Sequence, residues 1–193
     1  MNYMPFKLAP APARPVRRKV LRTITPTGVE RFIGEDEIIV SKTDLKGDIT
    51  YCNDVFMRLA GYSEAELLGA PHSIIRHPAM PRCVFKLLWD TLEKGEEIFA
   101  YVINLGKDGA HYWVFAHVTP SYDDQGKVVG YHSNRRAPNR RVVDEVITPL
   151  YRTLLEEEGK YKSRKEGMAA STEMLLALCR DKGMPYDQLV HAL

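Results

Sequence analysis

The chain has 193 residues, of which 45% are hydrophobic, and a formal net charge of +2 at pH 7. This length suits one domain with extensions, and a charge so close to zero gives no support to nucleic-acid binding. The three cysteines are widely spaced and fit no metal-ligand pattern, so no metal site is predicted and a reducing compartment is expected. No apolar run approaches the roughly 20 residues of a membrane span, and no signal peptide begins the chain, so we expect a cytoplasmic protein.

Residues 1–34 differ in composition from the rest of the chain. Prolines recur in this segment, and basic residues gather between Arg14 and Arg22. Because recurrent proline breaks helices, the segment is predicted to be an arm. Disorder is the default for such an arm, and docking on the core or on a partner is the alternative.

A strand hairpin is predicted to open the domain, and helices with recognisable ends follow it. The strands are residues 38–41 and 49–52, on either side of a turn at Gly47. Asn53 is a good N-cap for a short helix, and Ser63 begins a capping box for another. Proline 81 starts a longer helix that runs to residue 94. Apolar residues recur along that helix at three- and four-residue spacing, which predicts a core-facing side made of Val84, Phe85, Leu88, Trp89 and Leu92.

The most informative stretch is Ile-Arg-His-Pro-Ala-Met-Pro at residues 75–81. It places Arg76 and His77 directly before the proline-led helix. A guanidinium binds phosphate bidentately, and a helix N-terminus adds unpaired N–H groups, so the stretch is a plausible anchor for a phosphate-bearing cofactor. The alternative is an ordinary surface turn in which Arg76 is solvated and His77 caps a neighbour.

Three further strands are predicted at residues 98–104, 110–120 and 127–136, joined by turn-forming links into a meander. Alternation gives each strand two faces. Asn104 is the polar member of an otherwise apolar row, and the row that begins at Tyr112 continues with small residues, which leave room for something bulky. The opposite face is too aromatic to be solvated, so it should be covered by the arm, a C-terminal helix or another protomer; it carries Phe99, Tyr101, Trp113 and Phe115.

The C-terminal part is predicted to be helical. Residues 139–158 read as a helix that Pro149 kinks or breaks near Thr148. Residues 159–167 are expected to form a charged linker before two short amphipathic helices at 172–182 and 186–193.

This order of elements resembles a PAS domain, an α+β fold in which a five-stranded antiparallel sheet carries short helices on one face. The blocks that make the resemblance specific are Cys52-Asn53-Asp54-Val55-Phe56, Ala60-Gly61-Tyr62, Arg76-His77-Pro78 and His111-Tyr112-Trp113-Val114. They resemble the PAS domain of bacterial aerotaxis receptors over residues 43–154. The implied organisation is an N-terminal arm at 1–34, a PAS sensor domain at 35–137 and a C-terminal helical extension at 138–193.

The resemblance implies a protein that binds FAD without a covalent bond and reports redox or oxygen status in aerotaxis or energy taxis. The implied partner is a separate signalling protein, such as a chemotaxis transducer or kinase, with homodimerisation through the outer sheet face or the helices. The cofactor-binding residues it implies are Asn53, Arg76, His77, Trp89, Asn104 and Tyr112. Two departures from the family, Ala79 for an acidic residue and Ile98 for a tryptophan, would weaken binding or shift the redox potential.

No enzyme signature is present, and the chain is expected not to be an enzyme. Residues 72–81 contain no cysteine, which disfavours a covalent light-driven adduct. Two alternatives stay open: a haem protein with His72 or His77 as axial ligand, and a cofactor-free PAS module that only mediates protein contacts.

Overall fold

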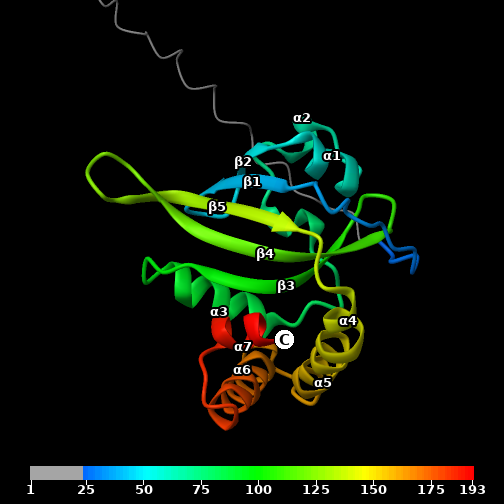
Figure 1. Ribbon diagram of the computed structural model, residues 1–193, viewed down its shortest axis with the longest axis vertical. Coiled ribbons are helices and arrows are strands. Elements are labelled where there is room, and N and C mark those ends of the chain that lie inside the picture. Colours follow the sequence, from blue (N-terminus) through cyan, green and yellow to red (C-terminus); the bar gives the residue numbers. More distant parts are fainter. Residues whose placement is uncertain (1–23) are drawn as a thin grey trace, which may run out of the picture.

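The computed structural model describes residues 24–193. Its centre is a five-stranded antiparallel sheet with strand order β2-β1-β5-β4-β3, which confirms the predicted fold class (Figure 1). The strands are β1 (Ile39–Asp44), β2 (Ile49–Cys52), β3 (Ile98–Leu105), β4 (His111–Tyr122) and β5 (Val128–Arg136). Strands β1, β5 and β4 lie inside the sheet, so side chains on them are fixed by neighbours on both sides.

Short helices cover one face of the sheet, which we call the inner face. They are α1 (Asp54–Ala60), α2 (Glu64–Leu67), the 3-10 helix η1 (His72–Ile75) and α3 (Arg82–Leu92). Their ends follow the local signals in the sequence. The Asn53 side chain accepts a hydrogen bond from the Phe56 N–H, Gly61 ends α1 in the left-handed conformation, and Ser63 begins the capping box of α2.

A second group of helices follows the sheet: α4 (Arg140–Val142), a π-helical turn η2 (Val143–Ile147), α5 (Thr148–Gly159), α6 (Arg164–Asp181) and α7 (Tyr186–Ala192). The predicted interruption at Pro149 takes the form of the π turn, which ends directly before α5. Pro149 has no N–H to donate, and it lies in the first turn of α5, directly after this π turn.

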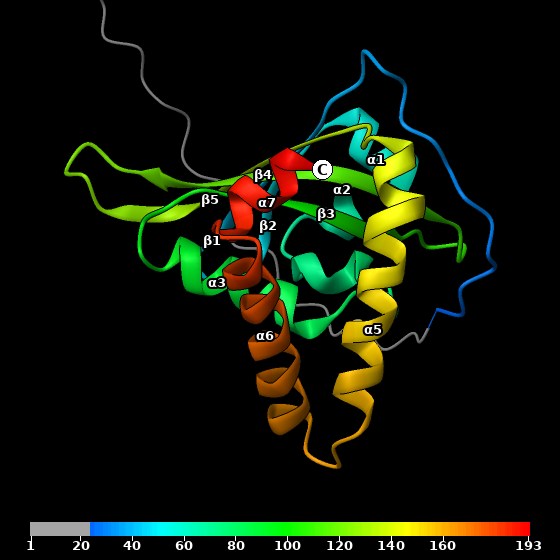
Figure 2. The same ribbon diagram turned by 60° about the horizontal axis from the view of Figure 1, so that its bottom comes forward.

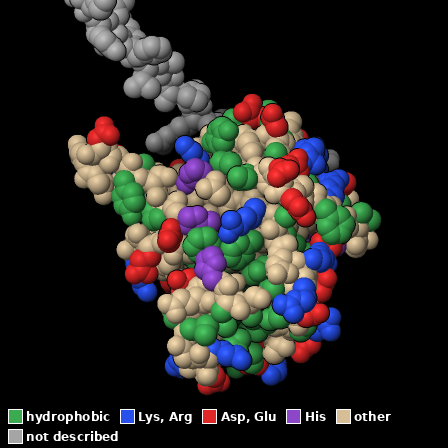
Figure 3. Space-filling model, viewed as in Figure 1, with side chains coloured by type: hydrophobic (Ala, Val, Ile, Leu, Met, Phe, Trp, Pro, Cys, Tyr) green, Lys and Arg blue, Asp and Glu red, His purple; other side chains and the backbone are tan. Residues whose placement is uncertain are grey.

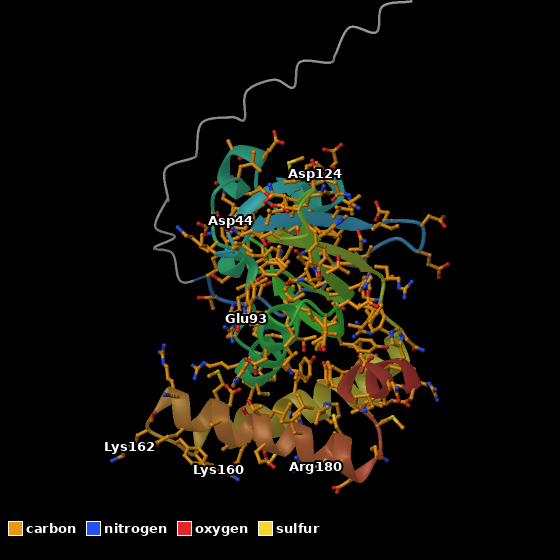
Figure 4. The ribbon with its side chains drawn as sticks, turned by 90° about the vertical axis from the view of Figure 1, so that its left-hand side faces the viewer. Asp44, Glu93, Asp124, Lys160, Lys162 and Arg180 are labelled. Carbon is orange, nitrogen blue, oxygen red and sulfur yellow. The ribbon has the colours of Figure 1, made fainter. Side chains whose placement is uncertain are left out.

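The predicted linker at 159–167 is wrong in extent. Ser163 caps α6 by accepting a hydrogen bond from the Glu166 N–H, so this helix begins at Arg164, well before residue 172. Gly167 lies inside α6 because the helix runs very close to α5 there: a Cβ at this position would sit 2.4 Å from the Glu158 carbonyl oxygen. Figure 4 shows the resulting hairpin, with Lys160 and Lys162 at its turn and Arg180 towards its other end.

The C-terminal helices supply the cover that the outer face of the sheet requires (Figure 2). The Tyr151 hydroxyl of α5 donates to the Tyr101 carbonyl, and the Tyr151 ring lies 5.9 Å from that of Trp113. The His191 ring of α7 packs edge-on against Phe99, 4.4 Å between centroids. On the face of the molecule drawn in Figure 3, histidine side chains lie among hydrophobic ones.

Part of the predicted arm docks on the sheet. Thr27 N–H donates to the Gly109 carbonyl at 2.9 Å, and Val29 and Arg31 exchange backbone hydrogen bonds with His111 at 2.8 Å. The expectation of disorder is therefore wrong for residues 24–34, because their backbone forms hydrogen bonds with the backbone of Gly109 and His111, at the end of the β3–β4 turn and the start of β4. The basic residues of the arm up to Arg22 lie outside the described part of the chain. Among residues 24–193, no helix is long and apolar enough to cross a membrane.

Candidate functional site

A cavity of about 170 Å³ lies between the inner face of the sheet and the helices η1 and α3. The sheet contributes small and polar side chains, and α3 contributes large apolar ones. The residues that line it are Ser41, Thr43, His72, Ser73, Ile75, Arg76, Phe85, Leu88, Trp89, Leu92, Val102, Asn104, Ala116, Val118, Tyr131, Ser133 and Arg135. The small row of β4 thus leaves open space, as the sequence indicates.

Asn104 occupies the inner face of β3, where the alternation of that strand predicts it. Its side chain is buried at 4% exposure, and its Nδ2 has no hydrogen-bond partner among the described residues. The backbone of Asn104 pairs with that of Arg76, which fixes the loop before α3 against the sheet. A buried amide donor without a partner costs about 1–3 kcal/mol, so this atom points to a missing acceptor in the cavity.

Arg135 is the main cavity residue that sequence reasoning misses. It lies on β5 and is only 3% exposed, with its guanidinium 4.5 Å from the centre of the Phe56 ring. Nη2 donates to Ser41 Oγ at 2.6 Å, whereas Nε and Nη1 have no partner in the described part of the chain. Burial lowers the pKa of Arg135 to about 10, which leaves it charged at neutral pH. Alternation along β5 carries the signal, since Tyr131, Ser133 and Arg135 share the inner face.

His72 extends this arrangement. Its Nε2 lies 3.2 Å from Ser41 Oγ, and its ring stacks on Phe56 with centroids 5.9 Å apart. Burial, and next the charge of Arg135, lower the pKa of His72 to about 3, so the ring is neutral at physiological pH. Arg135 can only donate to Ser41, so the Ser41 hydroxyl proton is left for His72 Nε2.

Arg76 and Trp89 lie at the edge of the cavity. The Arg76 guanidinium stacks over Phe85 at 4.5 Å and forms no ion pair within residues 24–193. Partial desolvation of its guanidinium at the cavity edge, and next the neighbouring charge of Arg82, lower the pKa of Arg76. Trp89 is 37% exposed and meets Tyr131 edge-on at 5.4 Å, so its description as a packed core aromatic is wrong. It stands where the cavity meets solvent.

The other three residues implied by the resemblance do not line the cavity. Asn53 Oδ1 accepts from Val40 and Phe56 N–H groups, and its Nδ2 donates to the Ile38 carbonyl, so its amide is fully used between β1 and α1. His77 Nδ1 accepts from the Ala79 N–H at 3.0 Å, which is the capping alternative. Tyr112 is completely buried on the inner face; its hydroxyl has no partner among the described residues, and burial raises its pKa.

The expected anion site at the start of α3 is already filled by the protein itself. Glu158 Oε1 of α5 accepts the Arg82 N–H at 2.7 Å and the Cys83 N–H at 3.2 Å, and it also accepts from Ser171 Oγ at 3.1 Å. A carboxylate is well placed at a helix N-terminus, where the N–H groups and the dipole both favour negative charge. The helix start therefore does not contribute to a phosphate anchor, and Arg76 is left as the cation of that site.

Within the described residues, no group of three or more histidine, cysteine, aspartate or glutamate side chains could hold a metal ion. The cavity itself offers buried hydrogen-bond donors, one buried cation and an apolar wall.

Comparison with known proteins agrees with this architecture. Residues 49–135 match the family model described as PAS fold. The sheet order, the inner helices and the cavity between them thus define a PAS domain. The chain is similar to bacterial aerotaxis receptors: it is 42% identical to the aerotaxis receptor of Escherichia coli (strain K12) over 123 residues, 63% of this chain and 24% of that receptor.

Other relatives are more distant. The nitrogen fixation regulatory protein of Klebsiella pneumoniae is 31% identical over 54% of this chain and 21% of its own length, so the chain spans less than a quarter of either relative. The light-state structure of the blue-light photoreceptor Aureochrome1 LOV has a TM-score of 0.51 at 23% identity, over 57% of this chain and 89% of that one. A light-oxygen-voltage domain studied with a flavin analogue has a TM-score of 0.50 at 22% identity, over 64% and 87%. These structures share the fold.

Replacement of Glu158 tests whether its carboxylate joins α5 to α3. Glu158→Leu removes the acceptor of the part-buried Arg82 N–H and of the buried Cys83 N–H, so we expect a loss of about 1–3 kcal/mol of unfolding free energy. Glu158→Gln keeps an acceptor oxygen and should lose less. Urea denaturation measures both, with Glu156→Leu on the exposed side of α5 as control. Equal stability of Glu158→Leu and Glu156→Leu would show that the contact contributes nothing.

Proposed function

We propose that the cavity binds the ring of a flavin, FAD in particular, and that the chain is a redox sensor that signals to a separate protein. The observation that carries the proposal is the pair of buried side chains with unpaired donors in one cavity, Asn104 and Arg135. A flavin ring is apolar over most of its area and has hydrogen-bond acceptors along one polar edge. Its apolar part suits Leu88, Val102 and Val118, and its acceptors suit the unpaired donors.

The volume of the cavity sets a condition for flavin binding. Its volume of about 170 Å³ lies below the roughly 300 Å³ at which ligand pockets usually begin. The cavity therefore has to widen, and Trp89 is the side chain that can move with least loss, since it already contacts solvent. Arg76, at the same edge and without a carboxylate partner in the described chain, suits the phosphate of the cofactor. We propose FAD rather than FMN because the resemblance to the PAS domain of bacterial aerotaxis receptors implies FAD.

Two observations favour flavin over haem. His77 is used as a cap outside the cavity, and His72 Nε2 faces Ser41. His77 thus does not line the cavity and His72 directs Nε2 to Ser41 rather than to a ligand, whereas the donors of Asn104 and Arg135 are free for acceptors.

We propose that the redox signal passes from the cavity to the C-terminal helices through β3. When bound, a flavin supplies reversible uptake of electrons and protons. Asn104 lies on the inner face of β3, and three residues earlier the Tyr101 carbonyl is held by Tyr151 of α5. A change in the hydrogen bond of Asn104 can therefore alter how α5 and α7 sit on the outer face, and these helices would present the signal to a chemotaxis transducer or kinase. Because they already cover the aromatic face, we place homodimerisation on the helices.

The purified protein should be yellow, and acid-released cofactor should run as FAD on chromatography. Arg76→Ala should lower the fraction of protein that carries flavin and leave the circular dichroism spectrum unchanged, since an exposed cation contributes little to the core. Arg141→Ala, an exposed arginine of α4, is the matched control. Colourless, well-folded protein that takes up no added FAD would favour the cofactor-free module, and a haem spectrum would also contradict the proposal.

Hydrogen exchange in the oxidised and dithionite-reduced states tests the output. We expect protection to differ in α5, α7 and residues 99–103, where the outer face meets its cover. The distant capping box of α2 serves as internal control and should not change. If a flavin-loaded protein exchanges identically in both states throughout these segments, it binds the cofactor without this route of signalling.

A further inference from the structure

We propose that Arg135 sets the redox preference of the cavity by making it bind the reduced, more negative form of the flavin more tightly than the oxidised form. This inference rests on the proposed function and adds a role that none of the residues implied by the resemblance carries. Two-electron reduction of a flavin by a soluble reductant, with uptake of one proton, adds one negative charge to the ring. A fixed positive charge in the cavity lowers the free energy of that product relative to the oxidised ring.

The first support is that the charge has no counterion. The groups closest to Arg135 are Ser41, Phe56 and His72, with the Tyr112 phenol and Cys52 thiol nearby, and all of these are neutral at physiological pH. No carboxylate forms an ion pair with Arg135 within the structure of residues 24–193. Buried charges are normally paired, because desolvation without a partner is costly. Among the described residues this charge thus has no counterion, and a ligand in the cavity can balance it.

The second support is that the guanidinium is held in place. Arg135 lies on β5, which is placed between β1 and β4. Its backbone pairs with Ile39 of β1 on one side and with Ala116 of β4 on the other. Ser41 on β1 accepts from Nη2, and Phe56 supports the flat face of the group. The two nitrogens without partners are therefore fixed, so little reorganisation is needed when negative charge appears.

The third support is the contrast with the other arginines. Arg76 is exposed at the edge of the cavity, where it suits a phosphate. Arg136 follows Arg135 directly but points to the opposite face, with its guanidinium 5.4 Å from the Phe115 ring. It therefore provides a matched control: the same residue type on the same strand, outside the cavity.

The test compares Arg135→Gln and Arg136→Gln by redox titration of the flavin-loaded proteins with dithionite. Arg135→Gln should lower the preference for the reduced form at least tenfold, which corresponds to a fall of about 30 mV in a two-electron midpoint potential. Arg135→Lys keeps the charge and should recover at least half of that fall. Arg136→Gln should leave the potential unchanged. An unchanged potential in a flavin-loaded Arg135→Gln protein would overturn the inference and leave the proposed function standing, whereas absence of flavin from the wild type contradicts the proposed function itself.

A second measurement is independent of cofactor uptake. In protein stripped of flavin, Arg135→Gln removes an unbalanced buried charge and keeps an amide that can bond to Ser41. The melting temperature should therefore rise, by about 2 °C or more for a chain of this size. A melting temperature below that of the wild type, with Arg136→Gln unchanged, would show that Arg135 is a structural residue and would contradict the inference.

Discussion

Burial of both faces of one antiparallel sheet is the constraint on which the rest of the structure depends. The outer face carries large aromatic side chains such as Phe99 and Trp113, and α5 and α7 cover them closely. The inner face carries Val102 and Ala116 at the same level of the sheet, and these small side chains do not fill the space beneath α3. Because one face of the sheet is packed tightly and the other loosely, the fold has a cavity on its inner face and a helical surface on its outer face. Only the thickness of the sheet separates the two.

The polar atoms in that cavity distinguish it from a simple packing defect. An apolar void would be stable when empty, whereas unpaired buried donors cost free energy in the ligand-free protein. Asn104 and Arg135 both impose such a cost, and the cost falls when an acceptor-rich ring binds between them. The same residues that destabilise the empty protein thus supply affinity, which couples cofactor occupancy to the stability of the sheet and of the helices that rest on it.

Local signals explain which parts of this structure the sequence could predict. Asn53, Ser63 and Pro81 act within a few residues of their position, so the helix starts were readable, and alternation placed Asn104 correctly on the inner face. Contacts between distant segments were not readable. Glu158 occupies the start of α3 from 76 residues away, which removed a predicted anion site.

Arg135 and Trp89 show the same limit of prediction from sequence: the first is more buried than its position suggests, and the second is more exposed. An arginine near the end of a strand is usually solvated, and only the pairing of β5 with β1 shows that Ser41 and Phe56 enclose this one. Trp89 has the spacing of a core residue, yet it lies at the edge of the cavity, where it is partly exposed to solvent. Helical periodicity indicates which side of α3 faces the sheet, but it does not indicate the distance between the helix and the sheet.

The most direct measurement of the central claim is a titration of the flavin-stripped protein with FAD, followed by NMR on the side-chain N–H signals of Asn104 and Arg135. The account predicts that the Asn104 Nδ2 and Arg135 Nε signals move together as binding saturates at one FAD per chain, while the Arg136 Nε signal stays in place. Saturable binding that leaves the Asn104 and Arg135 signals unmoved would place the flavin elsewhere and contradict the account.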